Sequence, residues 1–204
     1  MSEVYNQFSG RSIDRIQTLA DGVFAVAMTL LVLDVRLPDA PASDSHALWS
    51  QLTDLGPSVA AYVLSFTMLG TFWLALHTVL GLCDRSDRML AWAVLFFLFF
   101  VTTLPFTASV LADHVHVSLA VVLYWLNLAA LGVTLAWVVL HSRDQLVQPQ
   151  RGPAMRLVVR RLVLAQVLYA VAALITFASP VAAIVALAVV QLFFIVSPRI
   201  PFRV

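Results

Sequence analysis

Six segments of this chain are each long and apolar enough to cross a lipid bilayer as a helix, and no other feature of the sequence limits its fold as strongly. A hydrocarbon core of about 30 Å is crossed by about 20 helical residues. The segments lie near residues 16–36, 56–82, 89–112, 117–140, 157–178 and 180–197. Backbone polar groups inside a bilayer must be paired within the segment, which favours helices. The sequence therefore predicts an all-α integral membrane protein with six transmembrane helices in a single domain, residues 1–204.

The composition agrees with a membrane protein and argues against an enzyme. Hydrophobic residues make up 61% of the chain and charged residues 11%, which is far from the balance of a soluble domain. The single cysteine, Cys83, excludes an internal disulfide. The sequence contains no His-Glu-x-x-His zinc motif, no paired Gly-Asp protease motif and no serine with a plausible histidine partner. We therefore expect no catalytic residues, no resident metal and no cofactor.

The sequence predicts the structure of two connections between the helices. The loop "LPDAPASDSHALWSQLTDLGP" after the first helix is rich in proline, serine and aspartate, which predicts a surface excursion with a short interfacial helix around 47–52. Ser179 and Pro180 separate the last two segments and suit a tight helical hairpin.

The basic residues predict the orientation in the membrane, because cytoplasmic flanks accumulate lysine and arginine. All twelve are arginines, and under the six-helix map eleven fall on one side and only Arg36 on the other. The eleven are Arg11, Arg15, Arg85, Arg88, Arg143, Arg151, Arg156, Arg160, Arg161, Arg199 and Arg203. We expect both termini in the cytoplasm, and an acidic outer side that includes Asp34 at the outer end of the first helix.

The first helix carries an apolar stripe with a hydroxyl at its edge. Val26, Leu30 and Leu33 share a face because residues three, four and seven apart align on an α-helix, and Thr29 lies beside them. In a single subunit this stripe is a packing face. If several copies surrounded an axis, the same residues would form a dry constriction with weak polar coordination. Periodicity alone allows both interpretations.

Four polar residues lie within or beside the first two predicted spans. Arg15 directly precedes the first segment and Asp21 lies within it, and Trp73 and His77 share a face of the second. Ionisable residues inside a membrane are costly and usually paired within the bundle. Our hypothesis is a polar network at the cytoplasmic half that fixes the first helix against its neighbours; the alternative is a structural contact without a role in gating.

At these positions the sequence resembles the transmembrane protein 175 family of potassium channels. "RIQTLADGVFAVAMTLLVLD" is similar to the first helix of the family, with Arg15 and Asp21 matching its Arg-x-x-x-Phe-Ser-Asp signature and Leu19 and Ala20 replacing its phenylalanine and serine. "SFTMLGTFWLALH" resembles its second helix, and a Leu-Pro-Phe in the third segment is also similar. The residues that carry these two matches are Ser65, Phe66, Trp73, His77, Leu104, Pro105 and Phe106.

The resemblance implies a bacterial member, located in the plasma membrane, that assembles as a homotetramer around a potassium pathway lined by the first helix. It implies that Val26, Leu30 and Leu33 form the pore constriction and that Thr29 contributes potassium selectivity. Asp34 would form the outer mouth. The chain has no "TVGYG" carbonyl filter, so we expect potassium preference without sharp discrimination. The expected partners are copies of this chain, membrane lipids and permeant potassium ions, and not nucleic acid.

A proton-coupled secondary transporter, or a proton pathway, is the alternative function. Asp21 and His77 could bind and release protons as a helix moves. Transporters commonly show inverted repeats and helices broken near the midplane, whereas the first helix here has only Gly22 as a weak point. The sequence therefore favours the channel.

Overall fold

The computed structural model describes residues 13–38, 42–83, 86–142 and 152–196, and these ranges are almost entirely helical. The elements are α2 (Ile13–Leu30), the 3-10 helix η1 (Leu31–Asp34), α3 (Ser45–Asp54), α4 (Gly56–Gly81), α5 (Arg88–Asp113), α6 (Ser118–Ser142), α7 (Gly152–Leu174), the 3-10 helix η4 (Ile175–Phe177) and α8 (Pro180–Val196). The all-α prediction is confirmed for the part of the chain that the structure describes.

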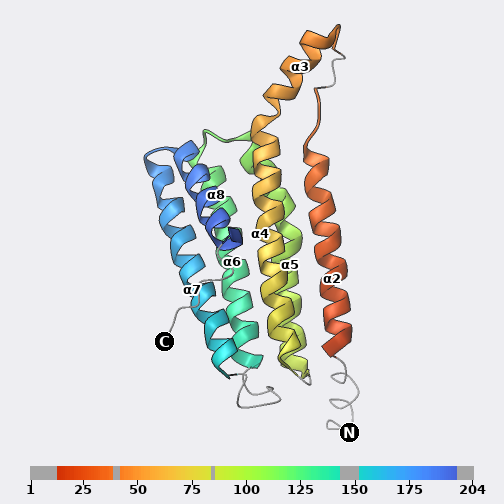
Figure 1. Ribbon diagram of the computed structural model, residues 1–204, viewed down its shortest axis with the longest axis vertical. Coiled ribbons are helices and arrows are strands. Elements are labelled where there is room, and N and C mark those ends of the chain that lie inside the picture. Colours follow the sequence, from red (N-terminus) through yellow and green to blue (C-terminus); the bar gives the residue numbers. More distant parts are fainter. Residues whose placement is uncertain (1–12, 39–41, 84–85, 143–151, 197–204) are drawn as a thin grey trace.

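The long helices form one elongated bundle with α2 at one edge and α7 at the other (Figure 1). α5 and α6 share the most extensive contact, α2 packs against α5 and α4, and α7 packs against α6 and α8. The short helix α3 projects beyond the end of the bundle, on the side of α2 and α4. α2 lies at the edge of the bundle, so among the described helices it has neighbours on one side only.

Five helices are long and apolar enough to cross a membrane, counted among the described residues. α2 reaches this length together with η1, and the last of the five runs from Met155 to Phe177. The sixth predicted span, 180–197, forms α8, an apolar helix of 17 residues. This length is slightly below the about 20 residues that a full crossing takes.

Aspartate side chains cap the N-termini of α3 and α5. The Asp44 carboxylate accepts a hydrogen bond from the Ala47 N–H at 2.8 Å and caps α3, which lies where the short helix around 47–52 is expected. The Asp87 carboxylate caps α5 in the same way through the Leu90 N–H at 2.7 Å. Such caps satisfy backbone donors that a first helical turn leaves without partners.

The helices α2 and α7 differ at their ends from the first and fifth predicted segments. The α-helix that begins the chain's first span ends at Leu30 and tightens into η1, rather than continuing to residue 36. Pro38 disfavours helical backbone at Leu37, the residue before it. α7 begins at Gly152 instead of 157.

Three aromatic rings fix α2 to the rest of the bundle. Phe24 of α2 and Phe72 of α4 both contact Phe97 of α5, with ring centroids 6.0 Å and 6.1 Å apart. All three side chains are buried. Because tilted aromatic pairs at these separations are favourable, the cluster sets the rotation of α2 about its own axis.

The described arginines follow the expected asymmetry along the bundle. Arg15 and Arg88 lie in the first turns of α2 and α5, at the same end of the bundle as the start of α7, and Arg36 follows η1 at the opposite end. The predictions for six of the arginines lie outside the described residues: Arg11, Arg85, Arg143, Arg151, Arg199 and Arg203.

Candidate ion-conduction site

One face of α2 is buried against the bundle. Ala20, Phe24, Ala27 and Leu31 follow one another at intervals of four, three and four residues, and each is at most 2% exposed. This spacing places them on a single side of the helix. They pack into the core that includes Phe97 of α5.

A second face of α2, continued in η1, is the apolar stripe, and it is exposed. Val26 is 58% exposed, Leu30 44% and Leu33 53%, although each is a large hydrophobic side chain. Thr29 and Asp34 are exposed along the same part of the chain. A helix that buries one apolar face and exposes a second has a surface that is available to further copies of the chain or to a permeation pathway.

The Thr29 hydroxyl already donates its hydrogen to a backbone carbonyl. Its Oγ1 donates to the Val26 carbonyl at 2.8 Å, within the same helix. A hydroxyl has one donor hydrogen and two acceptor lone pairs. The oxygen therefore keeps acceptor capacity that can face a cation.

Of the predicted polar network, the structure brings Asp21 and Trp73 together. The indole Nε1–H of Trp73 donates to the Asp21 carboxylate at 2.7 Å and links α4 to α2 across 52 positions of sequence. The distance is at the short end of the range for N–H···O hydrogen bonds.

Arg15 and His77 lie apart from this hydrogen bond. The His77 ring lies against Trp73, with centroids 5.5 Å apart, and both Arg15 and His77 are exposed. Within the described ranges, neither residue forms a hydrogen bond or ion pair with Asp21. A role for these two side chains in fixing α2 stays a prediction.

Sequence reasoning missed a buried polar network that joins three helices. Gln191 of α8 accepts from the Tyr169 hydroxyl at 2.7 Å, and its side-chain N–H group donates to the Thr67 carbonyl and the Thr71 hydroxyl at 2.8 Å and 2.7 Å. Gln191 is 1% exposed. Its only signal in the sequence is a lone amide in the apolar run "VALAVVQLFFIV".

A second missed contact pairs the motif residue Ser65 with Tyr124. Their hydroxyl oxygens lie 3.1 Å apart in a hydrogen bond between α4 and α6, and both residues are fully buried. Because a polar group buried in an apolar interior is costly unless paired, this bond explains a serine at that position on packing grounds.

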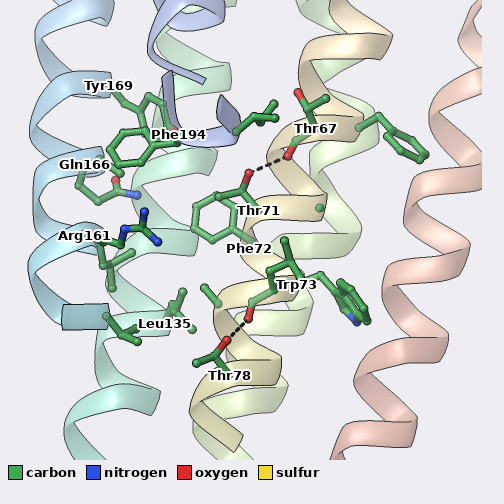
Figure 2. A pocket seen from close by; sticks show the side chains of 18 of the residues that line it. Thr67, Thr71, Phe72, Trp73, Thr78, Leu135, Arg161, Gln166, Tyr169 and Phe194 are labelled. Atoms are coloured by element: carbon green, nitrogen blue, oxygen red, sulfur yellow. Dashed lines mark hydrogen bonds between the residues drawn. The ribbon is translucent and has the colours of Figure 1, made fainter. Parts of the chain in front are cut away.

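A cavity of about 660 Å³ lies between α4 and α7, with α6 and α8 contributing to its walls (Figure 2). Thr71 of α4 and Arg161 of α7 point into it from opposite walls. Met28 of α2 also lines the cavity, whereas the stripe residues Val26, Leu30 and Leu33 do not.

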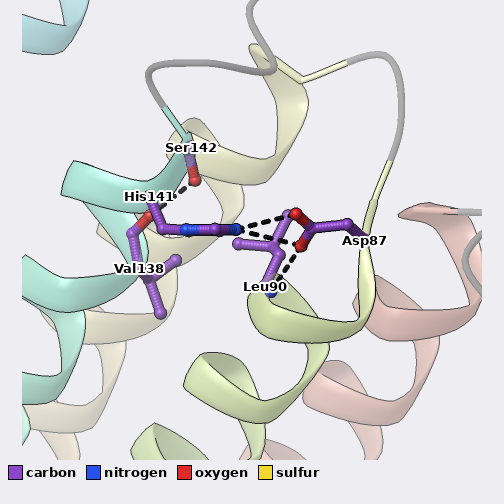
Figure 3. A network of polar contacts seen from close by, with 5 residues as sticks. All are labelled: Asp87, Leu90, Val138, His141 and Ser142. Atoms are coloured by element: carbon purple, nitrogen blue, oxygen red, sulfur yellow. Dashed lines mark hydrogen bonds and ion pairs between the residues drawn. The ribbon is translucent and has the colours of Figure 1, made fainter.

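At the end of the bundle where α5 starts and α6 finishes, a histidine and an aspartate connect these two helices (Figure 3). His141 Nε2 lies 2.9 Å from one Asp87 carboxylate oxygen and 3.0 Å from the other. Asp87 also caps α5, so one carboxylate serves both helices. No three His, Cys, Asp or Glu side chains of the described ranges gather as a metal site would require.

Comparison with known proteins decides the family. Residues 15–105 match the family model described as the endosomal/lysosomal potassium channel TMEM175. A potassium channel of Streptomyces collinus is 36% identical over 151 residues, which cover 70% of this chain and 71% of that protein. The chain belongs to the TMEM175 family. The resemblance seen in the sequence is confirmed, and the family is one of ion channels and not of enzymes.

The TMEM175 relationship extends to the fold and to animals. The crystal structure of a lysosomal potassium-selective channel TMEM175 homologue from Chamaesiphon minutus aligns with a TM-score of 0.80 and 26% identity, over 90% of this chain and 96% of that one. The endosomal/lysosomal proton channel TMEM175 of zebrafish, Danio rerio, is 31% identical over 107 residues, which cover 50% of this chain and 21% of that protein. Relatives are thus named for two different ions.

Proposed function

We propose that this chain is the subunit of a homotetrameric, potassium-preferring channel in a bacterial plasma membrane, with α2 of each subunit facing a central pore. The observation that carries the proposal is the two-sidedness of α2. One apolar face is buried against α4 and α5, and the other, with Val26, Leu30 and Leu33, stays exposed in the subunit. Membership of the TMEM175 family and the names of the bacterial relatives support potassium as the ion.

In the proposed tetramer, four copies of Val26, Leu30 and Leu33 form stacked apolar rings that constrict the pore. Aliphatic side chains do not replace the hydration shell of an ion, so a dry neck resists conduction until α2 rotates or moves outward. The Thr29 oxygen, which keeps acceptor capacity, lies between the rings of Val26 and Leu30 and accounts for potassium preference. Asp34 gives the outer mouth a negative charge that attracts cations.

The proposed topology has six transmembrane spans, with α8 as the sixth and both termini in the cytoplasm. The ends of the described helices support it, because Arg15, Arg88 and Arg156 lie toward one end of the bundle and Arg36 toward the other. No cofactor is part of the proposal, and potassium is the cargo.

Potassium flux from liposomes tests the pore assignment. Val26→Trp and Leu30→Trp, which place a bulky ring in the proposed constriction, should abolish flux through the purified, reconstituted channel. Val189→Trp is the matched control, because Val189 is 60% exposed, as Val26 is 58% exposed, but belongs to α8. Figure 1 shows α8 away from α2. Wild-type flux in both α2 variants would refute the assignment.

A proton pathway is the second candidate, and the proton-channel name of the zebrafish relative favours it. Asp21 is exposed on α2 and could carry protons. Current that reverses at the potassium equilibrium potential supports the potassium channel, whereas current that follows the proton gradient supports the second candidate.

A further inference from the structure

The cavity between α4 and α7 has walls that suit hydrocarbon. Most of its lining is apolar, and several of its polar side chains are paired within the protein. The Thr71 hydroxyl donates to the Thr67 carbonyl and accepts from Gln191, and the Thr78 hydroxyl donates to the Leu74 carbonyl. Because these groups are already satisfied, they offer little to water, and an apolar occupant loses nothing by contacting them.

The cavity reaches the surface of the subunit, because several of its lining side chains are exposed. Phe66, Leu74 and Ile195 contribute to its lining, and their side chains are 39%, 59% and 43% exposed. On an apolar helical bundle such side chains face hydrocarbon. At about 660 Å³, the cavity is within the range of about 300–1,000 Å³ of small-molecule sites.

One charged group, the guanidinium of Arg161, lies in this apolar wall. Arg161 is nine residues from the start of α7, which corresponds to about 14 Å along the helix axis. Since α7 and η4 together span Gly152–Phe177, Arg161 lies in the half of the helix that begins at the arginine-rich end. Long cationic side chains at this depth reach the headgroup region, and guanidinium groups bind phosphate in a bidentate manner.

We propose that the α4–α7 cavity binds an anionic phospholipid, with an acyl chain between Gly70 and Leu162 and its phosphate at Arg161. The charge of Arg161 selects an anionic headgroup over a zwitterionic one, while the apolar walls hold the chain. The site goes beyond ion conduction and does not depend on it. The proposed orientation, with the arginine-rich end in the cytoplasm, places the site in the inner leaflet.

Native mass spectrometry of the delipidated, full-length protein tests the site, with phosphatidylglycerol and phosphatidylcholine as probes. The wild type should bind phosphatidylglycerol about tenfold more tightly than phosphatidylcholine, a difference that corresponds to about 1.4 kcal/mol. Arg161→Gln should remove this preference by lowering the phosphatidylglycerol affinity more than the phosphatidylcholine affinity, because both headgroups carry a phosphate but only phosphatidylglycerol has a net negative charge. Gly70→Leu should weaken both lipids, because a Cβ at Gly70 meets no atom within 4 Å and a larger side chain fills the cavity.

Each variant has a control on its own helix. Gly81→Leu in α4 also meets no atom within 4 Å at Cβ but lies outside the cavity, and Arg156→Gln removes a charge from α7 away from it. Both should bind the two lipids as the wild type does. Equal affinity of the wild type for the two lipids overturns the proposal, as does wild-type phosphatidylglycerol affinity in either Gly70→Leu or Arg161→Gln with an unchanged unfolding temperature.

Discussion

The hydrogen bond between Trp73 and Asp21 holds α2 to α4, and its energy can be measured. The donor and acceptor atoms lie 2.7 Å apart, and the acceptor is a carboxylate. Hydrogen bonds to charged groups contribute about 1.5–3 kcal/mol. Asp21 is exposed, and couplings measured within membrane bundles average about 0.6 kcal/mol. We therefore expect a coupling of about 1 kcal/mol, or a factor of about five in the folding equilibrium.

A double-mutant cycle isolates this coupling. The free energy of unfolding is measured by titrating the detergent-solubilised protein with SDS, for Asp21→Ala, Trp73→Phe and the double variant. Phenylalanine keeps an aromatic ring beside His77 but removes the N–H donor. The cycle cancels the packing that each single change loses independently, and the remainder is the Trp73–Asp21 interaction.

His77 supplies the control pair. Its ring contacts Trp73, but among the described residues it forms no hydrogen bond with Asp21. The cycle of Asp21→Ala with His77→Ala should therefore give a coupling near zero. A Trp73–Asp21 coupling no larger than the His77–Asp21 coupling would refute the reasoning and would favour the broader network predicted from the sequence.

Three further changes have expected results. Thr29→Val keeps the side-chain shape but removes the oxygen, so potassium flux should persist while the potassium-to-sodium permeability ratio, taken from reversal potentials, falls toward one; an unchanged ratio excludes Thr29 from selectivity. Gln191→Leu removes the hydrogen bonds that join α8 to α4 and α7, and it should lower the unfolding temperature by about 2–4 °C for each kcal/mol lost without reducing flux, because α8 lies away from α2. Asp87→Ala should lower the free energy of unfolding by about 1 kcal/mol in the same assay, because the α5 cap is lost. Asp87→Asn still caps the helix and should lower it less. Equal losses in the two variants would show that the contact with His141 dominates.

The helices could be predicted from the sequence because bilayer-length apolar runs leave the backbone no other structure. Their ends could be predicted less well, since ends depend on local geometry. The turn of 3-10 helix at Leu31–Asp34 and the early start of α7 at Gly152 carry no hydropathy signal.

The stripe of α2 could be found by periodicity, but its exposure could not. Ala20, Phe24, Ala27 and Leu31 form a second apolar stripe on the same helix, and hydropathy alone does not say which of the two is buried. The contact of Phe24 with Phe97 decides it, and that contact joins residues 73 positions apart.

Which polar side chains of different helices bind each other could not be predicted either. The sequence placed Arg15, Asp21, Trp73 and His77 at suitable depths, because helical spacing fixes depth well. Which of them meet depends on how two helices are rotated against each other, and the structure pairs only Asp21 with Trp73 by a hydrogen bond. Family membership could be inferred from the same residues because the motif is read directly along the chain.

Thiol modification of the exposed α2 face tests most directly whether that face lines the ion pathway. The one native cysteine, Cys83, is buried, so the reagent should not change the current of the wild type. In a planar bilayer, a cationic, membrane-impermeant thiol reagent should suppress the potassium current of Leu33→Cys and leave that of Val189→Cys unchanged. Full potassium current through a Leu33→Cys channel whose modification is verified by mass would contradict the account.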